Sequence, residues 1–235
     1  ISSQLNINHL LIKNNIGGRD AGIIVNRGSS AVIANSTIVN NTGDTHPNYE
    51  AINGGGIVMD SSQVTLVNSI VFNNSPNSIL IHESVTPSTF TTSYSDIENG
   101  EAGIVNAFNG EVFWQDGNID GDPEFTDAQY GDYTLQTGSP CIDAGTADLD
   151  SDVYDDITDY CGTSPDMGAY ENCECYVELG DVNGNGEINI LDIVQISYYI
   201  LEISTPNFVC AADFNQDGQV NILDLVQIAN YILDN

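Results

Sequence analysis

The sequence predicts a mainly β chain in which a solenoid of stacked strands is followed by a small helical module. Three observations support this prediction. A loose repeat of short β-branched segments occupies residues 1–100, and a tighter repeat with an offset of 32 residues lies within residues 179–235. Apolar residues follow helical spacing only in the second of these stretches. We therefore expect the strands and the helices to occupy separate parts of the chain.

The first stretch carries four related seven-residue segments, whose starts differ by 26, 33 and 26 residues and lie at His9, Asn35, Asn68 and Tyr94. A short β-branched run follows each of the first three, at Gly22–Val25, Gly56–Met59 and Ser78–Ile81. Strands this short at this period predict stacked coils, because each coil can bury its apolar residues only against the next.

Asparagine pairs end three of these segments, at Asn14–Asn15, Asn40–Asn41 and Asn73–Asn74. Asparagine tolerates the left-handed conformation of tight turns, and stacked amides can hydrogen-bond along a solenoid axis. The pattern resembles the right-handed parallel β-helix of pectate-lyase-like proteins. A β-sandwich is the alternative, but its strands recur every 8–12 residues or so, a closer spacing than this repeat shows.

From Asp120 onward the coil repeat is lost. GDPEF at Gly121–Phe125, the segment Gly131–Gly145 and DMGAYE at Asp166–Glu171 resemble the closing segment of secreted bacterial β-helix proteins. Because the open end of a solenoid has unpaired edges, we expect this segment to cap the coils. The predicted organisation is coils over residues 1–125, a cap over 126–172, a linker over 173–178 and a helical module over 179–235.

The helical module contains the same loop twice, DVNGNGEINILD from Asp181 and DFNQDGQVNILD from Asp213. Oxygen-bearing side chains recur at positions one, three, five, nine and twelve, and Gly186 or Gly218 occupies position six. This is the spacing of a calcium loop, in which position seven contributes its backbone carbonyl. The sequence predicts two calcium ions, with ligands from Asp181, Asn183, Asn185, Glu187, Asn189, Asp192, Asp213, Asn215, Asp217, Gln219, Asn221 and Asp224.

Each loop leads directly into an apolar helix, with no convincing helix before it. One face of each helix is expected to be buried, formed by Ile193, Val194, Ile196, Ile200 and Leu201 in the first and by Leu225, Val226, Ile228, Ile232 and Leu233 in the second.

The two loop–helix units resemble the type I dockerin module over residues 179–235. This resemblance implies calcium-dependent docking on a cohesin-like protein. In dockerins the residues just before the last calcium ligand face the cohesin, and here these positions are Ile190, Leu191, Ile222 and Leu223. The alternative is that these apolar pairs pack inside the module or against the cap.

Charge excludes several classes of partner. The formal net charge is −31, and the only Lys and Arg residues are Lys13, Arg19 and Arg27. Such a chain repels nucleic acid and anionic membranes, and it contains no apolar run long enough to cross a bilayer. Because the chain opens on Ile1 within a repeat, we expect a C-terminal piece of a longer or processed exported protein.

Five cysteines indicate an oxidising, extracellular or cell-surface location. Cys141 and Cys161 are expected to form one disulfide within the cap. Either Cys173 or Cys175 is expected to pair with Cys210, and we assign Cys175 to that bond. The remaining cysteine is then free or paired between chains.

No grouping of residues identifies a reaction, so we assign no catalytic residue. Lys13, Arg19 and Arg27 could supply the base of a lyase, but exposed residues of the first coil are the commoner explanation. The sequence therefore favours a non-catalytic exported protein that docks on a cohesin-like protein or on another copy of itself. The alternatives are the C-terminal part of a secreted polysaccharide lyase or glycoside hydrolase, with polysaccharide as a further partner, and a subunit of a self-assembling filament.

Overall fold

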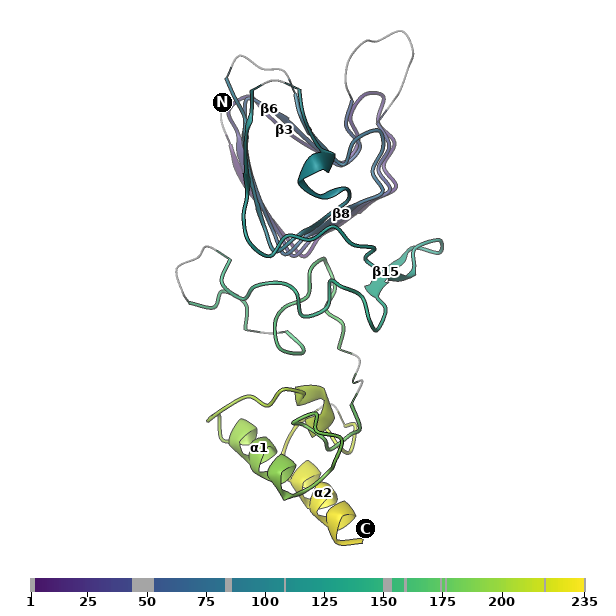
Figure 1. The fold of residues 1–235 in the computed structure, drawn as a ribbon, viewed down its shortest axis with the longest axis vertical. Coiled ribbons are helices and arrows are strands. Elements are labelled where there is room, and N and C mark those ends of the chain that lie inside the picture. Colours follow the sequence, from purple (N-terminus) through teal and green to yellow (C-terminus); the bar gives the residue numbers. More distant parts are fainter. Residues whose placement is uncertain are drawn as a thin grey trace. The chain divides into compact units, whose positions relative to one another are not determined.

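The computed structural model describes residues 3–43, 53–82, 86–107, 109–149, 154–158, 160–173, 175, 177–217 and 219–234. The chain forms two compact units, one of residues 1–158 and 165–171 and the other of residues 159–164 and 172–235. Figure 1 shows strands in the first unit and the two long helices in the second.

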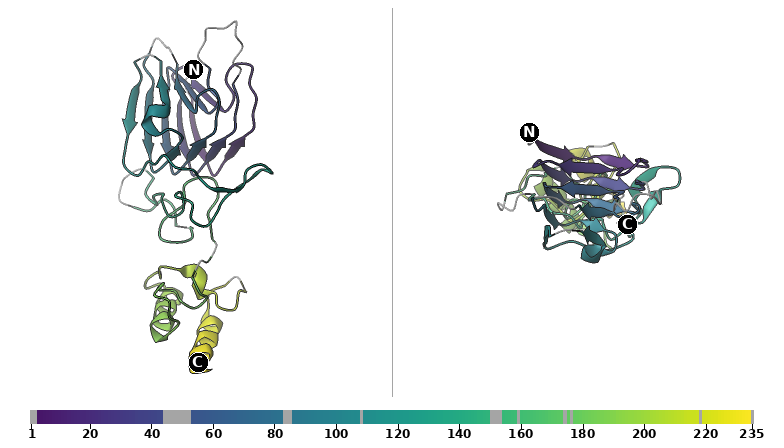
Figure 2. Two further views of the ribbon diagram at one scale, coloured as in Figure 1. Left: turned by 45° about the vertical axis from the view of Figure 1, so that its right-hand side comes forward. Right: turned by 90° about the horizontal axis from the view of Figure 1, so that it is seen from above.

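The first unit is a parallel β-helix of three sheets, as the repeat predicted. One sheet contains β1 (Gln4–Asn8), β4 (Ser30–Ala34), β7 (Gln63–Val67), β10 (Thr89–Ser93) and β13 (Glu111–Trp114). The second contains β2 (Leu11–Lys13), β5 (Thr37–Val39), β8 (Ile70–Phe72) and β11 (Asp96–Ile97). The third contains β3 (Ile23–Asn26), β6 (Ile57–Asp60), β9 (Ile79–Ile81) and β12 (Ile104–Asn106), preceded by the short helix η1 (Gly100–Gly103). Figure 2 shows the strands stacked as successive layers.

The core lies inside the coils, because in-register pairing places like residues above one another. Ile12, Ile38, Val71 and Ile97 form one such column across the second sheet. Ile38, Val71 and Ile97 are fully buried, and each such side chain contributes about 1.5–3 kcal/mol of transfer free energy. The neighbouring positions in each strand therefore point outward.

Asparagine ladders line the turns, as predicted. His9, Asn35, Asn68 and Tyr94, the starts of the four repeated segments, all have φ between 44° and 50°. The predicted pairs form such a ladder, because Asn15 Nδ2 donates to Asn41 Oδ1 and Asn41 Nδ2 donates to Asn74 Oδ1, both at 2.9 Å. These bonds run along the solenoid axis and hold successive turns in register.

The closing segment lies along the side of the coils, although we expected it to cap their open end. It begins with the antiparallel hairpin β14 (Phe125–Asp127) and β15 (Asp132–Leu135). Gly168 N donates to the Asn68 carbonyl at 2.8 Å, and Ala169 N donates to Thr37 Oγ1 at 2.9 Å. The segment therefore contacts successive coils beside the second sheet, where their outward polar groups offer hydrogen bonds.

The second unit contains α1 (Ile190–Ile200), η2 (Val209–Ala212) and α2 (Ile222–Asp234). Its apolar core includes Ile193, Ile196 and Ile200 of α1 and their counterparts Leu225, Ile228 and Ile232 of α2. The predicted faces were too wide, because Val194, Leu201, Val226 and Leu233 are exposed. They lie beside the i, i+3, i+7 stripe through which each helix packs. None of the described helices has the length and apolarity needed to cross a bilayer.

Two disulfides belong to the second unit. Cys175 bonds to Cys210, as predicted, whereas Cys161 bonds to Cys173 instead of to Cys141. Cys141 is a free thiol in the first unit, buried with Ile70, Leu135 and Met167. The prediction was wrong because Cys141 is a core residue of one unit and Cys161 belongs to the other.

Candidate calcium-binding and docking site

The first loop closes around the carboxylate of Asp192. Asn183 N donates to Asp192 Oδ1 at 3.3 Å, and Asn189 N donates to Asp192 Oδ2 at 2.9 Å. Asn189 is the N-cap of α1, and with Asp192 it forms a capping box, in which each side chain accepts from a backbone N–H of the first turn. The last loop position is therefore also part of the helix start.

Asp181 organises the beginning of the same loop. Asn185 N donates to Asp181 Oδ1 at 3.1 Å, and Gly186 N donates to Asp181 Oδ2 at 2.8 Å. Gly186 has φ of +83°, which only glycine adopts without strain, so this residue permits the turn that the loop requires. The loop thus folds back on its first residue.

The second loop repeats these contacts 32 residues later. Asn215 N donates to Asp224 Oδ1 at 3.1 Å, and Asn221 N donates to Asp224 Oδ2 at 2.8 Å. Asp217 N donates to Asp213 Oδ1 at 3.1 Å. Gly218, the predicted turn glycine, lies outside the described residues. The structure therefore brings together the first, third, fifth, ninth and twelfth positions of both loops.

The charge and burial of these carboxylates fit a bound cation. Asp192 and Asp224 have no exposed surface, and Asp181 is 3% exposed. The sequence of the second unit contains no Lys, Arg or His. Burying a carboxylate without a positive partner costs several kcal/mol, so an external cation would stabilise this arrangement.

The oxygen types favour calcium. Among the described residues, no three His, Cys, Asp or Glu side chains form a metal cluster. Each loop instead combines carboxylates with amide oxygens of asparagine and a carbonyl at position seven. The Glu187 carbonyl accepts from Asn189 Nδ2 at 3.3 Å, and the Gln219 carbonyl accepts from Asn221 Nδ2 at 3.0 Å. All-oxygen sites of this kind suit calcium, which accepts neutral oxygens and flexible geometry.

The predicted partner residues form two exposed apolar pairs at the starts of α1 and α2. Ile190 and Leu191 are 62% and 58% exposed, and Ile222 and Leu223 are 63% and 55% exposed. None of the four belongs to the core of the second unit, so the alternative that they pack inside the module is wrong. Leu191 N and Leu223 N donate to the N-cap side chains of Asn189 and Asn221, both at 2.9 Å.

Lys13 and Arg19 of the first coil both have partners within the first unit. Lys13 Nζ donates to the Gly131 carbonyl at 2.8 Å and lies 4.9 Å from the ring centroid of Tyr133. Arg19 forms an ion pair with Asp20 at 3.6 Å, and its guanidinium lies 2.9 Å from His82 Nε2. Lys13 thus holds the closing hairpin against the first coil.

Comparison with protein families gives two matches. The family described as Dockerin type I domain matches residues 179–233, and the family described as Right handed beta helix region matches residues 2–138. Dockerin type I domains bind calcium and bind cohesin partners. The dockerin match covers both loops and both exposed apolar pairs. No curated protein matches the chain.

Proposed function

The chain belongs to the right-handed β-helix family, and from this premise we propose an exported protein that attaches its β-helix to a partner through calcium-dependent docking of residues 179–235. The observation that carries the proposal is the duplicated loop, each copy of which ends at an exposed apolar pair. The two disulfides support export, since such bonds persist in oxidising compartments. We place this segment's function in attachment and assign it no catalytic residue.

Calcium would act by holding each loop and the first turn of its helix together. We propose two ions, bound by the twelve loop residues named above. Asp192 and Asp224 would be the last ligands, and each also accepts the backbone N–H of its N-cap residue, Asn189 or Asn221. Neutralising these buried carboxylates stabilises the helix start. Ion binding therefore fixes the position of the apolar pair next to it.

The proposed partner is a cohesin-like protein with an apolar groove. Ile190–Leu191 and Ile222–Leu223 occupy equivalent positions in the two repeats, so each pair offers the same small apolar surface. A partner that recognises one pair can therefore bind in either of two orientations. A second copy of this chain is the other candidate, and it would make the protein a filament subunit.

The β-helix provides a second candidate function. Its fold is of the type found in carbohydrate-active enzymes. The first unit would then be part of a secreted lyase or hydrolase, and docking would bring that enzyme to a surface or assembly. Activity of the whole secreted protein on plant or algal polysaccharides would distinguish this candidate from a non-catalytic rod.

Paired substitutions test the docking surface. We expect Ile190→Asp/Leu191→Asp to lower affinity for a cohesin only about twofold, because one of two equivalent orientations remains. The variant with all four residues changed to Asp should lose binding while still binding calcium. The matched control is Leu201→Asp/Leu233→Asp, which changes exposed apolar residues at the other ends of the same helices.

Surface plasmon resonance gives the affinities, and calorimetry gives calcium binding. Docking by the four-residue variant as tight as wild type would refute the proposed surface. Loss of calcium binding in that variant would show that the pairs support folding instead.

A further inference from the structure

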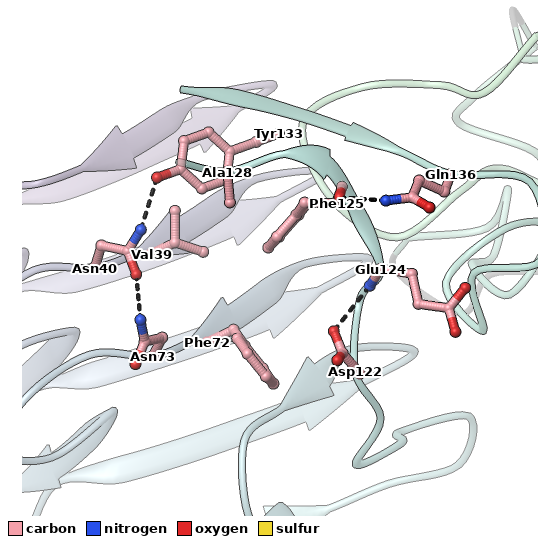
Figure 3. A pocket seen from close by; sticks show the side chains of 10 residues that line it. All are labelled: Val39, Asn40, Phe72, Asn73, Asp122, Glu124, Phe125, Ala128, Tyr133 and Gln136. Carbon is pink, nitrogen blue, oxygen red and sulfur yellow. Dashed lines mark hydrogen bonds between the residues drawn. The ribbon is translucent and has the colours of Figure 1, made fainter. Parts of the chain in front are cut away.

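A cavity of about 360 Å³ lies within the first unit, between the coils and the closing hairpin. It is separate from the calcium loops. Figure 3 shows side chains from the ends of β5 and β8 on one side and from the hairpin β14–β15 on the other. The residues that line it are Val39, Asn40, Phe72, Asn73, Asp122, Glu124, Phe125, Ala128, Tyr133 and Gln136.

Its apolar walls follow from the strand register. Lys13, Val39 and Phe72 are paired in successive coils, one position after the buried column of the second sheet. They therefore lie on the outer side of the sheet. The hairpin adds Phe125 and Tyr133, whose rings pack edge to face with centroids 5.1 Å apart. Phe72 and Phe125 both project into the space between coils and hairpin (Figure 3).

A polar chain borders these aromatic rings. Asn73 Nδ2 donates to Asn40 Oδ1, and Asn40 Nδ2 donates to the Tyr133 hydroxyl at 2.7 Å. Tyr133 is only 2% exposed, and among the described residues its hydroxyl makes no other hydrogen bond. Tyr133 therefore belongs to the wall of the cavity, where it fixes Asn40 and presents almost no surface of its own.

Hydrogen-bond acceptors complete the cavity. Glu124 N donates to Asp122 Oδ1 at 3.0 Å, which leaves the second oxygen of Asp122 open. The exposed Glu124 side chain extends away from the coils (Figure 3), so it adds negative charge nearby and makes no direct contact with Phe72 or Asn73. Gln136 Nε2 donates to the Phe125 carbonyl at 2.8 Å, so its side-chain oxygen also remains available. A ligand here would need several donors of its own.

We propose that this cavity binds an uncharged saccharide ring of an oligosaccharide or polysaccharide. Such a ring presents apolar C–H faces to Phe72 and Phe125 and hydroxyl groups to the Asp122 carboxylate and to the amides of Asn73 and Gln136. A uronate is disfavoured, because Asp122 and Glu124 repel its carboxylate and the nearest cation, Lys13, is held by Gly131 and the Tyr133 ring. The proposal does not depend on docking.

An organic ammonium ion is the competing ligand, because carboxylates beside aromatic rings also attract cations. Two observations favour the saccharide. The amides of Asn73 and Gln136 offer donors as well as acceptors, and an ammonium ion can use only acceptors. A Lys13 ammonium group already lies over the Tyr133 ring and would repel a second cation.

Calorimetry on the calcium-loaded full chain tests the proposal. The probes are neutral tetrasaccharides of β-linked glucose, xylose, mannose and galactose, with trigalacturonate and tetramethylammonium for comparison. The test variant is Asp122→Asn/Glu124→Gln, which keeps side-chain shape and the Asp122 acceptor for Glu124 N. Its control is Glu101→Gln/Glu111→Gln, which removes the same charge from exposed residues elsewhere on the β-helix. Phe125→Leu removes one ring and keeps an apolar side chain.

We expect at least one neutral tetrasaccharide to bind. The test variant should weaken its binding about tenfold or more, because it removes the charge of the acceptor at Asp122. Phe125→Leu should also weaken it about tenfold, because it removes one of the two rings that the sugar face contacts. The control should leave affinity unchanged, and trigalacturonate should not bind. Failure of every neutral probe at millimolar concentration would overturn the proposal. So would binding of tetramethylammonium alone, or saccharide affinity that is the same in the test variant and its control.

Discussion

Asp96 couples the β-helix to its closing segment and makes the stability of the first unit depend on pH. Its side chain has no exposed surface. Gly121 N donates to Oδ1 at 3.0 Å, and Cys141 Sγ lies 3.4 Å from Oδ2. Burial raises the pKa of Asp96 from 3.8 to about 6, with a smaller contribution from the nearby charges of Asp120 and Asp122, while the two hydrogen bonds act in the opposite direction.

The raised pKa of Asp96 makes the free energy of unfolding of the first unit larger at low pH than at neutral pH. The folded pKa lies above the unfolded value, so the folded state binds the additional proton between about pH 4 and pH 6. The stabilisation is present at low pH and is lost as pH rises through the folded pKa. A pKa of about 6 in place of 3.8 corresponds to about 3 kcal/mol in the free energy of unfolding.

The assay uses Trp114, the one tryptophan of the chain, which lies in β13. Its fluorescence reports denaturant unfolding of the first unit in calcium-saturated buffer. We expect the unfolding free energy of wild type minus that of Asp96→Asn to fall by about 3 kcal/mol between about pH 4 and pH 7. The matched control, Asp116→Asn, changes an exposed carboxylate and should show no such trend. A wild-type minus Asp96→Asn difference in unfolding free energy that stays constant with pH would show that the pKa of Asp96 is not raised by folding.

Two further predictions concern the second unit. The first loop should lose calcium before the second in a chelator titration, because it offers two carboxylates, Asp181 and Asp192, whereas the second offers three, Asp213, Asp217 and Asp224. The amide resonances of Gly186 and Asp217 report the order in which the loops empty. The reverse order would contradict the ligand assignment. Replacing Cys175 and Cys210 by Ser should lower the free energy of unfolding by about 4 kcal/mol, because that disulfide closes a loop of 35 residues. Replacing Cys161 and Cys173 by Ser should lower it by about 3 kcal/mol, because that disulfide closes a loop of only 12 residues. Helical circular dichroism in denaturant measures both, and a larger loss for the shorter loop would count against this estimate.

The repeats made much of the fold predictable. The positions aligned at His9, Asn35, Asn68 and Tyr94 all share a left-handed turn, so a sequence repeat here reports a repeated backbone conformation. The sheet of β1, β4, β7, β10 and β13 was missed, although its strands alternate polar and apolar residues, as in QVTLV of β7. Alternation of polar and apolar residues over only five positions is a weaker indication of a strand than the repeated segments are.

The loops were predictable for the same reason, since ligand spacing is local in sequence. The Cys161–Cys173 bond and the saccharide cavity were not. Phe72, Phe125 and Tyr133 meet only because the hairpin lies beside β5 and β8, and no pattern in the sequence encodes that contact. Similarly, Cys141 resembles a disulfide cysteine until the structure places it in a buried cluster with Met167.

We propose above that calcium holds residues 179–235 in the folded form that docks on a partner. The most direct measurement is the circular dichroism of the full chain in calcium, in magnesium and in chelator. We expect chelator to abolish the helical signal of α1 and α2 and calcium to restore it. Magnesium should not restore it, because the loops offer many oxygen ligands at flexible distances, which suit the larger ion. The β signal of the first unit should persist throughout. A helical signal that is the same in calcium and in chelator would show that calcium does not hold the module folded.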